Sequence, residues 1–209
     1  MRLAEAKAAA AVLVNALALF CERIEVAGSI RRNKPEVKDV EIVCVPKVVQ
    51  RPSRQATLFG AGGTEDENLV DGVVADWLRE GGAKPRLGKD NKAAIGSSYK
   101  RLLVQVRGTW MALDLFSVLP PRQWGLIYLI RTGSGVGPSG QAYDGFGPAM
   151  LARWKSVSGG GYSKNGCLHE ADGRPVPTPE EDDVFRVCRV VWVPPEERTS
   201  AAAVKESLC

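Results

Sequence analysis

The chain has a single histidine, no long apolar run and no cysteine pattern of the kind that binds zinc. That histidine, His169, lies in a glycine-rich stretch, so we interpret it as a surface residue rather than the centre of a Ser-His-Asp or Cys-His site. The five cysteines are odd in number and no pair has zinc-ligand spacing, which argues against a structural zinc site and a disulfide scaffold. We therefore predict a reducing, cytoplasmic location.

No apolar run reaches the roughly 18–20 residues that a membrane span requires. Neither a P-loop nor a dinucleotide-binding motif is present, because Gly133, Gly135 and Gly137 lack the required spacing and the preceding strand. With 209 residues and 44% hydrophobic residues, the chain has room for one large or two small domains and is too apolar to be disordered. The net charge of +4 permits a polyanionic partner, and we expect a monomer that does not enter a membrane.

The apolar periodicity predicts an α+β fold. Spacings of three and four predict a helix over residues 3–24, and short strands are expected at 24–27, 39–45, 99–107 and 110–118. A loop at 50–64 is followed by a helix with a capping box of Thr64 and Glu67. After Pro120-Pro121, helices are expected near 123–131, near 150–155 and from Thr178 onward, with the last dozen residues frayed. Trp124 and Trp154 are interpreted as core residues rather than as platforms for stacked bases.

Three acidic residues carry the functional interpretation. Asp39 and Glu41 are two residues apart on a predicted strand, so both side chains share one face, about 6.6–7 Å apart along the backbone. Asp114 lies between two leucines, where an acid is costly unless a cation neutralises it. Three acids on one face suit Mg²⁺, and two such ions stabilise both oxygens of a phosphoryl displacement. Taken alone, Asp-x-Glu more often marks the wet face of an antiparallel strand.

A second pattern suits a phosphate. Gly28-Ser29 follows a predicted strand, and two arginines come immediately after. Glycine allows close backbone approach, the serine hydroxyl donates to phosphate oxygens, and Arg31 or Arg32 would hold the remaining oxygens. Six basic residues between the later strands form either a solvated loop or a surface for nucleic-acid phosphates: Lys84, Arg86, Lys89, Lys92, Lys100 and Arg101.

Together these motifs resemble the nucleotidyltransferase superfamily and, more closely, the family X DNA polymerases related to DNA polymerase beta. The resemblance runs from about Leu3 to Arg198. It implies a palm domain over residues 1–119, with a mixed or antiparallel sheet and helices, followed by a small α+β thumb-like domain over residues 120–209. The motifs that carry it are Ala27-Gly28-Ser29-Ile30-Arg31-Arg32, Asp39-Val40-Glu41, Leu113-Asp114-Leu115-Phe116, Thr132-Gly133-Ser134, residues 179–185 and residues 193–198.

The resemblance implies DNA-directed transfer of a nucleotide from a dNTP to a DNA 3′-hydroxyl, of the repair or gap-filling type. Its cofactor would be two Mg²⁺ ions, for which Mn²⁺ can substitute, and its partners a nucleoside triphosphate and a DNA primer/template or single-stranded 3′ end. Asp39, Glu41 and Asp114 would bind the ions, with Asp114 next to the primer 3′-hydroxyl. Ser29 and Arg32 would hold the β- and γ-phosphates beside Gly28, while Thr132 and Gly133, with Ser134, would line the nucleotide.

The chain also departs from the family. Ile130-Arg131 replaces the aromatic pair that often precedes Thr-Gly, so we expect weaker exclusion of ribonucleotides. The family's lyase domain has no counterpart, and lyase activity is not expected. Two alternatives stay open. One is a nucleotidyltransferase that is template-independent or that acts on RNA or a small molecule. The other is a palm that binds nucleic acid without catalysis, against which the three intact acids argue.

Overall fold

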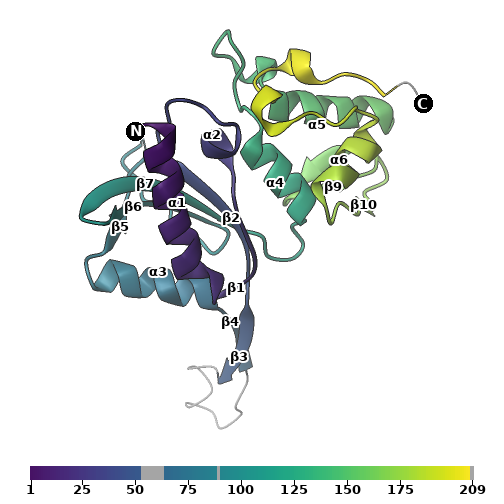
Figure 1. Cartoon of the computed structure of the whole chain (residues 1–209). Helices are drawn as coiled ribbons and strands as arrows, with labels where there is room; N and C mark the ends of the chain where they lie inside the picture. Colours follow the sequence, from purple (N-terminus) through teal and green to yellow (C-terminus); the bar gives the residue numbers. More distant parts are fainter. Residues whose placement is uncertain (53–63, 89, 208–209) are drawn as a thin grey trace.

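The computed structural model describes residues 1–52, 64–88 and 90–207, and its centre is a five-stranded mixed sheet (Figure 1). The strands β2 and β7 run parallel, and every other neighbouring pair in this sheet is antiparallel. Helices cover the sheet, which confirms the expected α+β class. In spatial order the strands are β1 (Cys21–Val26), β2 (Val40–Pro46), β7 (Thr109–Ser117), β6 (Tyr99–Val106) and β5 (Ala83–Pro85).

One face of the sheet packs against α1 (Leu3–Ala18) and α3 (Leu69–Arg79). Strand alternation sends the even-numbered side chains of β2 and the odd-numbered leucines of β7 to this face. Each aliphatic side chain buried in this way stabilises the fold by about 1.5–3 kcal/mol. The members of this cluster on the two strands are Val40, Ile42, Cys44, Leu113 and Leu115, all fully buried.

The first helix is shorter than its periodicity predicts. It ends at Ala18, and strand β1 begins at Cys21, because residues 21–26 pair with β2 instead of continuing the helix. The predicted turn at Gly28-Ser29 is the start of a one-turn helix, α2 (Gly28–Arg31). Tertiary pairing therefore overrides the helical pattern at its C-terminal end.

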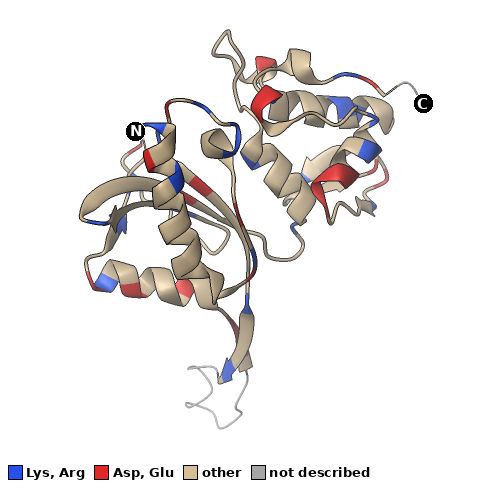
Figure 2. Cartoon of the chain, in the orientation of Figure 1, with Lys and Arg blue, Asp and Glu red and all other residues tan. Residues whose placement is uncertain are grey.

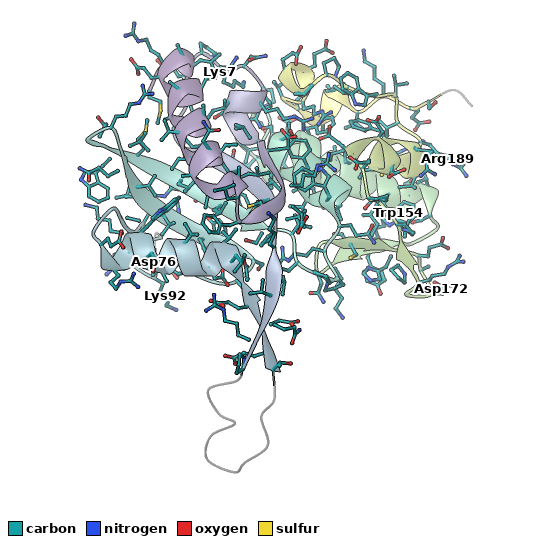
Figure 3. The ribbon with its side chains drawn as sticks, turned by 60° about the horizontal axis from the view of Figure 1, so that its bottom comes forward. Lys7, Asp76, Lys92, Trp154, Asp172 and Arg189 are labelled. Carbon is teal, nitrogen blue, oxygen red and sulfur yellow. The ribbon has the colours of Figure 1, made fainter. Side chains whose placement is uncertain are left out.

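The predicted capping box before α3 is wrong. Residues Thr64–Asn68 form strand β4, which pairs with β3 (Val48–Pro52) in a separate hairpin that projects from the body (Figure 3). The helix is capped instead by Asn68, whose side-chain oxygen accepts a hydrogen bond of 3.0 Å from the Val70 amide. Most of the loop expected at 50–64, residues 53–63, lies outside the described residues.

Beyond residue 120, a second hydrophobic cluster lies among α4 (Trp124–Thr132), α5 (Phe146–Val157) and α6 (Glu181–Cys188). The Trp154 side chain belongs to this cluster, as its sequence position predicted, and Figure 3 labels it in this half of the molecule. A small sheet completes this part, with strands β8 (Tyr162–Lys164), β9 (Cys167–His169) and β10 (Pro175–Val176), together with the short 3₁₀ turns η2 (Ala142–Asp144), η3 (Pro195–Glu197) and η4 (Ala201–Ala203).

Two expectations for the C-terminal part are wrong. Helix α6 begins at Glu181 with a capping box of Glu180 and Asp183, because Thr178 is buried and bonded to the Gln123 side chain rather than capping the helix. The final segment does not fray before residue 207. Its η4 turn packs on the second cluster, and Glu206 pairs with Arg153 at 2.5 Å.

A third cluster joins the sheet to the helices that follow it. On the sheet face away from α1, Val43 of β2 and Phe116 of β7 pack against Trp124, Ile127 and Tyr128 of α4. Trp124 is thus buried in the core, as predicted. This face also carries Glu41, the one acid of β2, so α4 lies beside it. The domain boundary expected at residue 119 stays a prediction.

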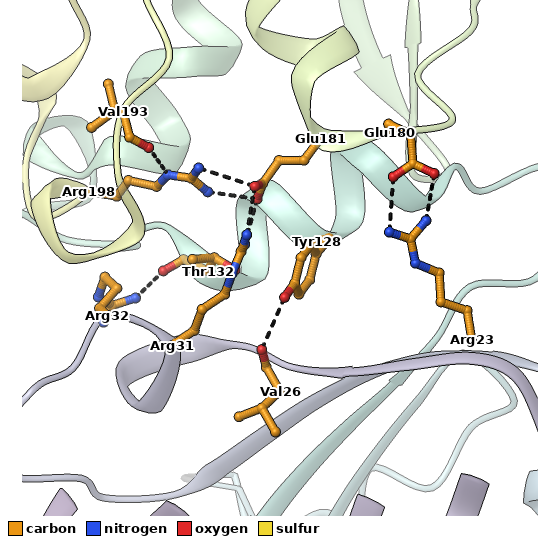
Figure 4. Close-up of polar contacts among 10 residues, drawn as sticks. All are labelled: Arg23, Val26, Arg31, Arg32, Tyr128, Thr132, Glu180, Glu181, Val193 and Arg198. Carbon is orange, nitrogen blue, oxygen red and sulfur yellow. Dashed lines mark hydrogen bonds and ion pairs between the residues drawn. The ribbon is translucent and has the colours of Figure 1, made fainter.

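Charged residues reinforce this junction (Figure 4). The first turn of α6 is acidic (Figure 2), and its Glu181 carboxylate binds two guanidinium groups at once. Arg31 of α2 donates to the two carboxylate oxygens over 2.6 and 2.8 Å, and Arg198 over 2.6 and 3.1 Å. Beside this triad, Arg23 of β1 makes a second forked pair with the more exposed Glu180.

The Arg198 guanidinium is completely buried. It lies near the rings of Phe146, Phe185 and Trp192, at 5.0–5.8 Å from their centres, and its Nε donates to the Val193 carbonyl over 2.8 Å. Burial by itself would raise the pKa of the Glu181 carboxyl, but the hydrogen bonds from Arg31 and Arg198 outweigh burial and lower that pKa. Glu181 is therefore ionised and is the counter-ion of both arginines.

We expect Glu181→Gln to reduce the free energy of unfolding by about 3 kcal/mol, because removing one member of a buried charge network leaves the others uncompensated. The matched control is Glu180→Gln, which breaks an exposed pair and should cost less than about 1 kcal/mol. Urea-induced unfolding followed by circular dichroism measures both. Equal, small losses in the two variants would contradict the role assigned to Glu181.

Candidate active site

The parallel pairing of β2 with β7 places two of the predicted acids side by side. Glu41 is the register partner of Asp114, and Asp39 lies just before β2, two residues ahead of Glu41. Because side chains alternate along a strand, the three carboxylates lie on the sheet face that α4 partly covers. Their neighbours on the opposite face are the fully buried aliphatic residues of the first cluster.

Basic and aromatic side chains surround Asp114. Arg86, which follows β5, donates from Nη2 to both carboxylate oxygens of Asp114 over 2.8 and 2.7 Å and lies 3.4 Å from Asp39 Oδ2 through Nη1. The Tyr99 hydroxyl donates to Asp114 Oδ1 over 3.0 Å, and Arg101 Nε is 3.9 Å from the same oxygen. Asp114 is 9% exposed, so these partners replace most of its water.

Glu41 has a different environment. It packs directly over Gly28, where an added side-chain carbon would lie 1.7 Å from Glu41 Oε2, and Gly28 has a positive φ of 62°. Glycine is therefore required here both by backbone conformation and by the carboxylate above it. Burial raises the pKa of Glu41 to about 7, with a further contribution from Asp39 and Asp114, while Arg32 and Arg131 act in the opposite direction.

Two half-buried arginines lie near Glu41 without an ion-pair partner among the described residues. Neither Arg32 nor Arg131 forms an ion pair with any acidic residue that the structure describes. Arg32 donates to the Thr132 carbonyl, and the Arg131 guanidinium lies 4.1 Å from the centre of the Phe116 ring. Within the described residues, Arg32 Nε, Arg131 Nε and the Ser29 hydroxyl are buried without a hydrogen-bond partner. Such unpaired donors are suited to an anion.

The residues expected to line the nucleotide have structural partners here. Thr132 is fully buried, and its hydroxyl accepts a hydrogen bond of 2.7 Å from Arg31. A side chain at Gly133 would lie 2.7 Å from a ring carbon of Phe146, so close helix packing requires glycine. The Ser134 amide donates to the Arg198 carbonyl over 3.0 Å. All three lie at the end of α4, next to the arginines of α2.

The donor set suits a hard divalent cation, because carboxylate oxygens are the ligands that Mg²⁺ and Mn²⁺ prefer. In the described part of the chain, no three acidic, histidine or cysteine residues converge as a ready metal site. The Arg86 guanidinium lies on Asp39 and Asp114 and supplies positive charge to both carboxylates. The chemistry of the three carboxylates therefore fits the expected ions, with Arg86 in their place.

Sequence reasoning did not assign Arg86, Arg101, Tyr99 or Arg131 to this site. Tyr99 and Arg101 could have been predicted, because they are two residues apart on a strand that pairs with the strand of Asp114 and so share its face. Arg86 belongs to the basic cluster noted above, whose members separate in the structure. Lys100 is buried and paired with Asp71, Lys84 lies over the Trp110 ring, and Lys89 falls outside the described residues.

Neither known protein-family models nor curated proteins give a match to this chain. Among the helices that the structure describes, none is both long and apolar enough to cross a membrane.

The raised pKa of Glu41 predicts a pH-dependent gain in stability for Glu41→Gln in the presence of EDTA. The folded protein binds this proton more tightly than the unfolded chain, whose ordinary value is 4.5, so wild-type stability falls as pH rises from about 4.5 to about 7. At about pH 8 the variant should be more stable by on the order of 2 kcal/mol, and below about pH 4.5 the gain should vanish.

Urea unfolding across this pH range measures the effect. The control is Glu22→Gln, which removes the same charge at an exposed position on β1 and should show no such pH dependence. A Glu41→Gln gain that is equal at every pH would show that proton binding at Glu41 is not the cause.

Proposed function

We propose that this chain is a nucleotidyltransferase of the family X DNA polymerase type, which adds a nucleotide from a dNTP to a DNA 3′-hydroxyl. The observation that carries the proposal is the register pairing of Glu41 with Asp114, with Asp39 on the same face. Nearby are two arginines, Arg32 and Arg131, that form no ion pair with a described residue. In this proposal, residues 1–119 form the palm that holds the acids and residues 120–209 form the thumb-like part that contacts the nucleotide.

The three carboxylates Asp39, Glu41 and Asp114 would hold two Mg²⁺ ions, for which Mn²⁺ can substitute. When bound, these ions supply stabilisation of the negative charge on the attacking and leaving oxygens. The positive charge of such cations would offset the burial and the like-charge repulsion that raise the pKa of Glu41, so Glu41 would be ionised in the loaded protein.

The protein's own groups then position the substrates. Ser29 and Arg32 would bind the β- and γ-phosphates, and Arg131 adds a second guanidinium near Glu41. The 3′-oxygen bonds to the α-phosphorus as the bond to the β-phosphate oxygen breaks, and pyrophosphate leaves. The proton of the hydroxyl passes to Asp114. Fixed cationic groups stabilise the transition state because they need no reorganisation during the reaction.

Extension of a labelled primer tests the proposal. Wild-type protein should extend a gapped or recessed primer with dNTPs in Mg²⁺, and Asp114→Asn should reduce kcat/KM by at least about a hundredfold, because it removes charge stabilisation from the reacting centre. Asp76→Asn is the control, since this aspartate lies on the exposed surface of α3 (Figure 3) and should leave the rate unchanged.

The same assay distinguishes the other acceptors. Extension without a template, or of an RNA primer only, would assign the chain to a different class of nucleotidyltransferase. Absence of any extension by a protein that binds the primer would leave a nucleic-acid-binding palm without catalysis. Equal extension with dNTPs and rNTPs would agree with the weaker exclusion of ribonucleotides that we expect from Ile130-Arg131.

Arg32→Ala should lower kcat/KM by about a hundredfold, and equally for all four dNTPs, because the side chain would contact only the triphosphate. Arg79→Ala, an exposed arginine on α3, is the matched control. A loss that depends strongly on the base would show that Arg32 reads the base or template instead. Arg32→Ala also removes the hydrogen bond to Thr132, so thermal unfolding of the variant shows whether the loss of activity comes from a less stable fold.

A further inference from the structure

Two of the three carboxylates already hold a cation that belongs to the chain itself. The Arg86 guanidinium reaches both strands of the site, with Nη2 at 2.7 and 2.8 Å from the Asp114 oxygens and Nη1 at 3.4 Å from Asp39 Oδ2. Only 16% of its side chain is exposed. A guanidinium presents several N–H donors at fixed positions, so one Arg86 side chain can bind both carboxylates at once, and this is a specific contact rather than a diffuse surface pair.

The oxygens that Arg86 occupies are the ones a divalent cation would need. Mg²⁺ and Mn²⁺ bind carboxylate oxygens directly at short range and demand a near-octahedral set of oxygens. A guanidinium cannot share the same carboxylate lone pairs with such an ion without moving. The backbone of Arg86 is tied to the sheet by its amide, which donates to the Arg101 carbonyl over 3.0 Å. The side chain alone therefore has to turn away.

We propose that Arg86 is a positioning residue that competes with divalent cations for Asp39 and Asp114, and that a nucleic-acid phosphate takes its guanidinium when a cation binds. This inference rests on the proposed function. A released guanidinium requires another anion, and the oxygens of a phosphate can accept hydrogen bonds from several of its N–H donors at once. Arg101, whose side chain is 36% exposed, lies next to it and adds positive charge at the same place. Metal and nucleic acid then bind cooperatively, since each removes an obstacle to the other.

Mn²⁺ binding to the full-length, substrate-free protein tests the competition, by electron paramagnetic resonance or calorimetry. Arg86→Gln should bind Mn²⁺ at least about tenfold more tightly than wild type, which is within the usual range of coupling between linked sites. Arg101→Gln is the matched control. It removes an equal charge near Asp114 but only a 3.9 Å contact, and should change the affinity by less than about threefold.

A second measurement tests whether a nucleic-acid phosphate binds the Arg86 guanidinium once a cation is present. Fluorescence anisotropy gives the affinity for a labelled single-stranded DNA oligonucleotide in Mg²⁺ and in EDTA at equal ionic strength. For wild type, Mg²⁺ should tighten binding by about fivefold or more, and for Arg86→Gln this enhancement should largely disappear. Arg86→Lys guards against a folding defect, because it keeps the charge but loses the planar guanidinium with its several donors. Its Mn²⁺ affinity should lie between those of wild type and Arg86→Gln.

An unchanged or weaker Mn²⁺ affinity in Arg86→Gln would overturn the inference, and so would an equal gain in Arg101→Gln, or no Mn²⁺ binding by any of the proteins. An Mg²⁺ enhancement of DNA binding that persists in Arg86→Gln would overturn the phosphate step. These results are separate from primer extension. A protein that shows the competition but extends no primer would refute the proposed function, and one that extends primers with unchanged Mn²⁺ affinity would refute only the role of Arg86.

Discussion

The parallel register of β2 and β7 is the constraint on which the candidate site depends. Because Glu41 faces Asp114 directly and Asp39 comes two residues earlier, three carboxyl groups gather on one sheet face beside a hydrophobic helix. Ionisation of all three is stable only with compensating cations. The surrounding arginines follow from this requirement, with Arg86 and Arg101 next to Asp114 and with Arg32 and Arg131 flanking Glu41.

The same electrostatic requirement appears at the junction of the two parts. Glu181 neutralises Arg31 and the fully buried Arg198, so a carboxylate of α6 connects α2 to the C-terminal chain segment. Arg31 and Arg32 are adjacent in sequence and both bind Thr132 at the end of α4, but only Arg31 also reaches Glu181. The short helix α2 and the arginine that follows it are therefore tied to both α4 and α6. A shift of α4 would move the Thr132 carbonyl that Arg32 binds.

Several side chains serve packing and the proposed chemistry at once. Gly28 was interpreted from the sequence as a place of close approach to a phosphate, and in the structure it makes room for the Glu41 carboxylate. Thr132 and Gly133 were interpreted as nucleotide contacts, and here they bond to Arg31 and pack on Phe146. Gly28, Thr132 and Gly133 therefore keep the end of α4 close to the acids. These packing contacts are compatible with the proposed binding of a nucleotide at the same place.

The sequence by itself determined the α+β class, the paired strands around Gly108, the core positions of Trp124 and Trp154, and the common face of Asp39 and Glu41. These follow from local periodicity, which depends only on neighbouring residues. Only the tertiary structure decided where α1 ends, which residue caps α3, and that Arg86 lies on Asp39 and Asp114. Each of these depends on contacts between segments far apart in sequence, where strand pairing and charge compensation outweigh local preference. Arg86 is 28 residues from Asp114, and no spacing along the chain records that contact.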